Sequence, residues 1–252
     1  MNTVDPLFET CLRLGDTALV LGQRLAEWSS KAPTVELDIA LSNHALDMIG
    51  QAQLFLEYAG RVEGKGRDED ALAYHRQDFE FRNAMMAELP RGDFAFTMVR
   101  QFLFASFAEA FYQGMLASTD TDLAAIAGKA EKEMAYHMRH CGEWVVRLGD
   151  GTEESHARAQ AALDEFWPYV HELFTTDDVD QAMIEKGILP DASALKDEWL
   201  EHVKSVMARA TLSLPEDDWM PSGGRTGQHT EHLAYLLAEM QVLPRTYPDA
   251  KW

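Results

Sequence analysis

The hydrophobic positions of this chain recur every three or four residues over most of its length, a spacing that predicts helices. The clearest seam alternates steps of four and three without a break: Leu7, Cys11, Leu14, Ala18, Leu21, Leu25 and Trp28. A second seam follows, and we expect its helix to span about residues 36–58 and to stop at Gly60. The chain shows no alternating strand pattern, so the sequence predicts an all-α fold.

Two more long helices are predicted in the middle of the chain. Residues 94–118 are apolar around most of the helical circumference, which predicts a helix buried on several sides. Residues 120–148 carry another seam, which a glycine turn closes: Ala127, Ala130, Met134, His137, Cys141, Trp144 and Leu148. Further helical segments are expected at residues 69–89, 153–174, 193–210 and 230–240.

The lengths of the four long helices suit a bundle. Helices of roughly 23 to 28 residues are each about 35 to 42 Å long at 1.5 Å per residue. More than 30 residues separate the second helix from the third, which allows the long crossover of a ferritin-like bundle. We therefore predict a single ferritin-like four-helix domain over residues 1–252, with additional C-terminal helices.

Composition excludes several classes of function. The 252 residues carry a formal net charge of −20, and such a surface repels nucleic acid and anionic membranes unless a dense basic patch is present. Cys11 and Cys141 lie in apolar stretches without metal-ligand spacing, which is typical of a reducing compartment. The sequence has no signal-like or membrane-spanning run, so we expect a cytoplasmic protein.

A ferritin-like bundle raises the question of a di-iron site. Such a site takes one Glu from each of two helices and Glu-x-x-His from each of the other two. The charged residues of the first helix all point away from its seam: Glu9, Arg13, Asp16, Arg24 and Glu27. We therefore expect no inward carboxylate on that helix.

The other helices also depart from this ligand set. On the second helix, Asp47 is followed three residues later by Gly50 where an imidazole is needed. The fourth helix has Glu133-x-x-Tyr136, while His137 lies on the seam beside Glu133 and is interpreted as its buried hydrogen-bond partner. We predict no catalytic, metal-binding or cofactor-binding residue, only remnants of a degenerate site: Asp47, Glu109, Glu133 and His137.

Two other short patterns carry weaker metal signals. Glu153 and His156 form the only literal Glu-x-x-His, at a polar helix start, and we interpret it as a chance match. Near the C-terminus, His229 and His232 have a spacing that zinc sites use, but no third ligand is evident. We expect this segment to dock the last helix, with Thr230 as the N-cap.

Five long blocks of the chain, in order, resemble the C-subunit family of phenylacetyl-CoA epoxidase: RLGDTALVLGQRLAEW, ELDIALSNHALDMIGQAQ, DEDALAYHRQDFEFRNAMMAELPRGDFAFTMVRQF, EMAYHMRHCGEWVVRLGDGTEES and TGQHTEHLAYLLAEMQ. The resemblance implies a ferritin-like structural subunit of a multicomponent monooxygenase in phenylacetate catabolism. In that family a homologous A subunit holds the di-iron centre, and a reductase with FAD and an iron–sulfur cluster delivers electrons from NADPH. The resemblance thus implies partner subunits and no cofactor in this chain.

Two alternatives stay open. The chain could be a di-iron oxygenase in its own right, with an atypical ligand set of Asp47, Glu109, Glu133 and His137. It could also be a helical module for an unrelated partner. An anionic coenzyme A thioester would need a local basic patch, which we do not expect from the available cations: Lys65, Arg67, Lys129, Lys132 and Arg139.

Overall fold

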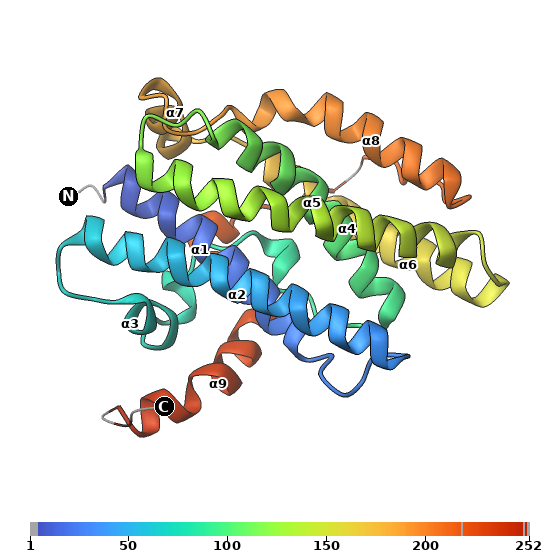
Figure 1. The fold of residues 1–252 in the computed structure, drawn as a ribbon, viewed down its shortest axis with the longest axis horizontal. Coiled ribbons are helices and arrows are strands. Elements are labelled where there is room, and N and C mark those ends of the chain that lie inside the picture. The colour runs from blue at the N-terminus through green and yellow to red at the C-terminus, as the bar shows by residue number, and fades with distance from the viewer. Residues whose placement is uncertain (1–4, 218, 249, 251–252) are drawn as a thin grey trace. The chain divides into compact units, whose positions relative to one another are not determined.

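The computed structural model describes residues 5–217, 219–248 and 250, and none of these residues forms a β-strand. The all-α prediction is therefore confirmed over this part of the chain (Figure 1). The α-helices are α1 (Pro6–Ala26), α2 (Val35–Glu63), α3 (Glu69–Tyr74), α4 (Phe94–Met115), α5 (Thr121–Gly149), α6 (Glu153–Val170), α7 (Asp178–Glu185), α8 (Lys196–Arg209) and α9 (Glu231–Thr246). No helix in the described ranges combines the length and the apolar character that crossing a membrane requires.

The chain divides into two compact units. The first unit takes its described residues from 1–31, 38–90 and 222–252, and the second takes 32–37 and 91–221. The first unit thus contains α1, most of α2, α3 and α9, and the second contains α4 to α8. The single domain that the helix pattern predicts stays a prediction.

In the first unit, two glycines let α1 and α2 approach closely. A Cβ atom added to Gly15 would lie 2.8 Å from Leu56 Cδ2, and one added to Gly22 would lie 2.9 Å from Ile49 Cγ1. These glycines are seven residues apart, so both face the same neighbouring helix. The predicted seam of α1 is buried at Cys11, Leu21 and Leu25.

In the second unit, α4 is the central helix. It contacts α5, α6 and α8, which confirms the prediction that its apolar circumference is buried on several sides. The indole Nε1 of Trp199 on α8 donates to the carbonyl oxygen of Leu103 on α4 at 3.2 Å. Figure 1 shows α4 and α5 running side by side.

The predicted helix over residues 69–89 is wrong beyond its first turns, because α3 ends at Tyr74. After Tyr74, side-chain oxygens accept hydrogen bonds from backbone N–H groups that a helix would pair with its own carbonyl oxygens. Asp16 of α1 accepts the backbone N–H of Arg82 at 2.8 Å, and Thr17 accepts that of Ala84 at 3.0 Å. The α7 helix was not predicted.

The predicted end of the second helix at Gly60 is also wrong, since α2 continues to Glu63. Gly60 is needed for a close approach within the first unit, because a Cβ atom there would lie 2.1 Å from the carbonyl oxygen of Arg67. No side chain larger than hydrogen fits at that distance.

The expectation that no acid of the first helix faces inward is wrong for Asp16. This carboxylate is fully buried on the side of α1 away from the seam, and it forms an ion pair with Arg76 that includes a 2.9 Å contact to Nη1. The side opposite the seam is covered by the chain after α3 and is therefore not solvated. Glu88 and Glu172 are buried as well, so not all acidic residues lie on the exterior.

We predict that Asp16→Ala lowers the free energy of unfolding by about 3 to 5 kcal/mol, because it leaves the Arg76 guanidinium buried without its carboxylate. Glu201→Ala is the matched control, since the exposed Glu201–Lys204 pair at 2.8 Å contributes at most about 1 kcal/mol. Urea denaturation measures both variants. Equal losses in the two would contradict the assigned role of Asp16.

Candidate functional site

The residues predicted as remnants of a metal site are divided between the two units. Asp47 lies on α2 in the first unit, whereas Glu109 on α4 and Glu133 and His137 on α5 lie in the second. Each group is therefore described within its own unit.

His137 is fully buried, and its Nδ1 atom lies 3.0 Å from Nε2 of Gln101 on α4. The Gln101 amide N–H is the donor of this hydrogen bond, which joins α4 to α5. The sequence interpretation paired His137 with Glu133 and missed Gln101. The available signal was the amide of Gln101 in the middle of a phenylalanine-rich helix.

Glu133 is mostly buried and lies 3.6 Å from Nζ of Lys129, one turn earlier on α5. Its charge also acts on Tyr112 of α4: burial of the phenol raises the Tyr112 pKa, and the Glu133 carboxylate raises it further. A protonated phenol and a lysine therefore surround this carboxylate.

Glu109 has a different set of neighbours. Partial burial raises its pKa, and the negative charges of Glu131 on α5 and Glu198 on α8 raise it further. Glu109 therefore lies near other carboxylates, whereas Glu133 lies near a lysine.

A buried cation also occupies this unit. Arg100, directly before Gln101 on α4, is fully buried, and its guanidinium carbon lies 6.0 Å from the centroid of the Phe166 ring. A di-iron centre needs a surplus of anionic ligands to offset its own charge. The buried Arg100 guanidinium adds positive charge to the second unit, which works against that requirement.

The residues of the first unit also depart from the Glu-x-x-His motif. Asp47 is half-buried, and the buried His44 precedes it by three residues, which reverses the order of Glu-x-x-His. Gly50 supplies no ligand atom where the motif requires an imidazole. Asp16, the buried acid that the sequence interpretation missed, is engaged by Arg76.

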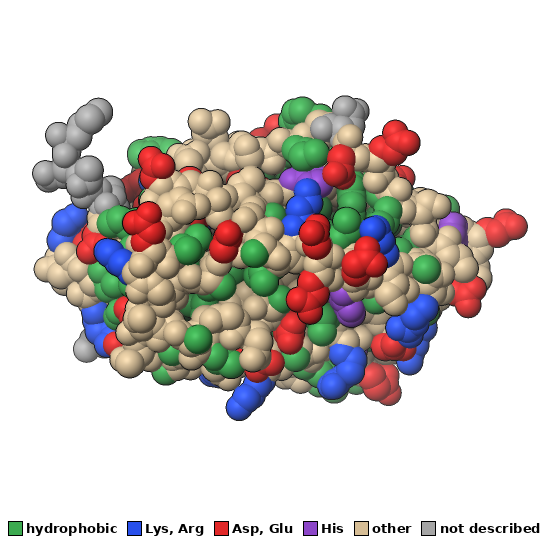
Figure 2. Space-filling model, turned by 90° about the horizontal axis from the view of Figure 1, so that it is seen from above, with side chains coloured by type: hydrophobic (Ala, Val, Ile, Leu, Met, Phe, Trp, Pro, Cys, Tyr) green, Lys and Arg blue, Asp and Glu red, His purple; other side chains and the backbone are tan. Residues whose placement is uncertain are grey.

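The basic side chains considered for an anionic substrate are largely paired. Arg67 donates to Glu63 through Nε at 2.8 Å, and Lys65 lies 3.1 Å from the same carboxylate. The hydrogen bond from Arg67 is the main reason that the pKa of Glu63 is lowered. Figure 2 shows acidic side chains scattered over one face, with basic side chains lying among them.

The His229 side chain docks the start of α9 onto the rest of the first unit. His229 Nδ1 lies 2.5 Å from Glu88 Oε1, and its Nε2 lies 3.0 Å from the carbonyl oxygen of Phe81. Thr230 is the N-cap residue of α9, but its hydroxyl donates to Glu88 Oε2 at 2.7 Å instead of capping the helix. His229 thus uses both ring nitrogens inside the first unit, which leaves neither for zinc.

The only literal Glu-x-x-His is part of a helix start. Thr152 caps α6, and Nδ1 of His156 bonds the carbonyl oxygen of Gly149 at 2.8 Å. These contacts join the end of α5 to the start of α6.

Comparison with known proteins places the chain in a family. Residues 1–252 match the family described as phenylacetic acid catabolic protein. The chain is also similar to the C subunit of 1,2-phenylacetyl-CoA epoxidase of Escherichia coli, with 44% identity over 241 residues that cover 96% of this chain and 97% of that protein.

This chain belongs to the phenylacetic acid catabolic protein family. The resemblance seen in the five sequence blocks is thereby confirmed, as is the ferritin-like, all-α fold class.

We predict that Glu109→Gln makes the protein more stable at neutral pH. Because the folded-state pKa of Glu109 is raised, its contribution to stability is fully present below the ordinary glutamate pKa and is lost as the pH rises through the folded pKa. The glutamine variant does not ionise, so its advantage is near zero below the ordinary glutamate pKa and grows as the pH rises above it. Thermal denaturation across this range measures the difference.

The matched control is Glu165→Gln, an identical change at an exposed position of α6. Its stability relative to the parent protein should not follow that pH profile. A Glu109→Gln variant that is less stable than the parent at pH 7 would show that the ionised carboxylate is stabilised in the folded protein.

Proposed function

We propose that this chain is a non-catalytic structural subunit of a multicomponent phenylacetyl-CoA 1,2-epoxidase, in which it supports a homologous di-iron A subunit. Family membership and the 44% identity to a C subunit over nearly both whole chains support this proposal. In the proposed complex the A subunit holds the iron and performs the oxygen chemistry of aerobic phenylacetate catabolism. A reductase subunit with FAD and an iron–sulfur cluster supplies electrons from NADPH in the cytoplasm.

The observation that carries the proposal is the state of His137. This is the one imidazole on the apolar seam of α5, and its Nδ1 lone pair accepts a hydrogen bond from Gln101 at 3.0 Å. A buried, hydrogen-bonded imidazole between two helices has a structural role without any metal. Tyr136 and Gly50 stand where the family's metal-binding motif needs the other imidazoles.

The charge distribution bears on the substrate. Coenzyme A is polyanionic, while this chain has a net charge of −20 and its Lys65, Arg67 and Lys129 side chains face carboxylates. A site for the thioester needs unpaired cations, which these positions do not offer. We therefore propose that most of the substrate binding energy comes from the A subunit.

Co-expression with the homologous A subunit tests this function. We expect the two chains to purify as one complex, and we expect epoxidation of phenylacetyl-CoA to require the A subunit, the reductase and this chain together. The isolated chain should show neither NADPH-dependent oxygen uptake with the reductase nor measurable binding of a coenzyme A thioester.

Turnover by this chain with the reductase alone would contradict the proposal and would favour a di-iron oxygenase with an atypical ligand set. Failure of the purified chain to bind the A subunit would contradict the proposed assembly.

A further inference from the structure

The last helix, α9, carries apolar side chains both on its buried side and among its exposed residues. Leu233, Leu236 and Leu237 are buried in the first unit. On the other side Tyr235, Val242 and Leu243 are 72%, 53% and 52% exposed, with the small residues Ala234 and Ala238 among them. Charged side chains, including Glu239 and Arg245, lie among these exposed apolar residues. Exposed apolar side chains that gather on one helix, with charged ones beside them, are typical of a surface that binds a protein partner.

The position of α9 is fixed within the first unit. At its N-terminus the backbone N–H of Thr230 donates to Glu88 Oε2 at 2.7 Å. In its last turns Gln241 donates to the carbonyl oxygens of Ala73 and Arg76 at 3.0 and 3.1 Å. A surface held in place before binding loses little conformational entropy when a partner covers it.

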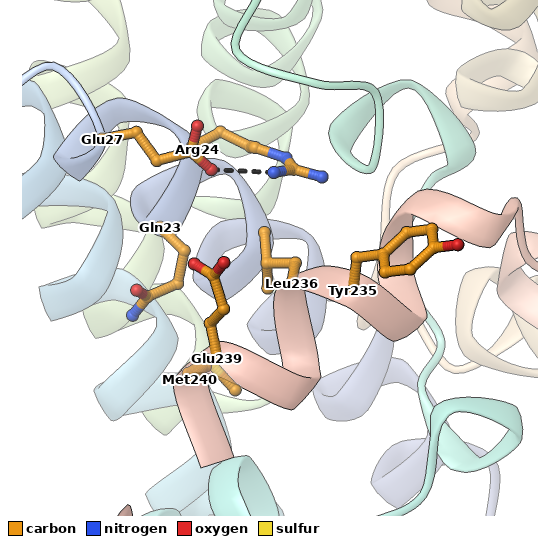
Figure 3. Close-up of a pocket in the computed structure, with 7 residues that line it drawn as sticks. All are labelled: Gln23, Arg24, Glu27, Tyr235, Leu236, Glu239 and Met240. Carbon is orange, nitrogen blue, oxygen red and sulfur yellow. Dashed lines mark hydrogen bonds and ion pairs between the residues drawn. The ribbon is translucent and has the colours of Figure 1, made fainter. Parts of the chain in front are cut away.

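A pocket of about 250 Å³ lies beside this apolar side, within the same unit. Its lining comes from α1 and α9: Gln23, Arg24, Glu27, Tyr235, Leu236, Glu239 and Met240. Figure 3 shows the Glu239 carboxylate reaching from α9 toward the part of α1 that carries Gln23 and Glu27. The pocket therefore joins the apolar side of α9 to a group of polar side chains.

The charges in this pocket do not cancel. Arg24 is engaged by the Glu27 carboxylate at 2.7 Å and by the carbonyl oxygen of Glu88 at 2.7 Å. Glu239 forms no hydrogen bond or ion pair with the part of the chain that the structure describes. One carboxylate therefore remains uncompensated next to exposed apolar side chains, and it favours a cationic group on whatever covers them.

We propose that the outer side of α9, together with this pocket, is a docking surface for the di-iron A subunit of the proposed complex. The partner would lay an apolar helix against Tyr235, Val242 and Leu243 and insert an Arg or Lys side chain beside Glu239. This inference rests on the proposed function and specifies the surface that the assembly uses. The pocket volume lies below the roughly 300 to 1,000 Å³ of small-molecule sites, which favours a single long side chain as its occupant.

Binding of the full-length chain to the purified A subunit tests the surface. We expect Val242→Glu to raise the Kd at least tenfold, because it places a charge at the centre of the apolar contact. Glu239→Lys should weaken binding about tenfold by repelling the inserted cation, and Glu239→Gln should weaken it less while reducing its dependence on salt. Leu116→Glu, at an exposed apolar position of the second unit, is the matched control and should bind like the parent chain.

The outcomes separate this inference from the proposed function. If the parent chain does not bind the A subunit, the proposed function fails. If the parent chain binds the A subunit and the folded Val242→Glu and Glu239→Lys variants bind it with the same Kd, the proposed α9 surface is wrong. The proposed function is not contradicted by that result. Circular dichroism establishes that each variant is folded.

Hydrogen exchange on the parent proteins gives a second measurement that needs no variant. Slower exchange of α9 amides in the complex supports the surface, and unchanged exchange there overturns it. Self-association of the isolated chain that Val242→Glu abolishes would assign the surface to a second copy of the chain and would also overturn the inference.

Discussion

Two buried carboxylates, those of Asp16 and Glu88, hold the first unit together. Asp16 joins α1 to the chain after α3 through Arg76 and the backbone N–H of Arg82. Glu88 accepts hydrogen bonds from Asn83, His229 and Thr230, and thereby attaches the start of α9 to that same stretch. Buried charges of this kind specify one arrangement more than they add net stability, because their desolvation offsets most of the attraction.

The proposed role as a subunit without metal chemistry requires that the buried polar groups of the ferritin-like scaffold find partners within the chain. In the first unit a buried carboxylate is neutralised by a guanidinium, and in the second the seam imidazole is satisfied by an amide. Both arrangements meet the hydrogen-bonding needs of buried polar groups from within the chain. These contacts require no iron, which is consistent with the proposed structural subunit.

The long helices could be predicted from the sequence because their seams are strictly periodic. The predicted starts at residues 94 and 120 agree with the helix caps, since the Asp93 and Asp120 side chains accept the backbone N–H groups of Phe96 and Leu123. The segment after α3 could not be predicted in the same way, because its conformation depends on Asp16 and Thr17, which are distant in sequence. Periodicity places Asp16 away from the seam correctly, but it does not reveal that another segment covers that side.

For the candidate site, the sequence reveals only the positions that lack a metal-ligand side chain. Gly50 and Tyr136 can be read directly at the positions where ligands are needed. The partner of His137 depends on how α4 and α5 face each other, and a single sequence does not specify that register. The exposed side of α9 likewise could not be predicted, because an apolar helical pattern does not show which of its positions are buried against the rest of the chain.

The most direct test of the central claim is the iron content of a complex whose A subunit has lost its own histidine ligands by substitution. This chain is intact in that complex, so any di-iron centre that it can form remains. The account predicts a complex that still assembles but contains no di-iron centre. A full di-iron complement in that complex, lost only when His137 or Glu133 of this chain is also replaced, would contradict it.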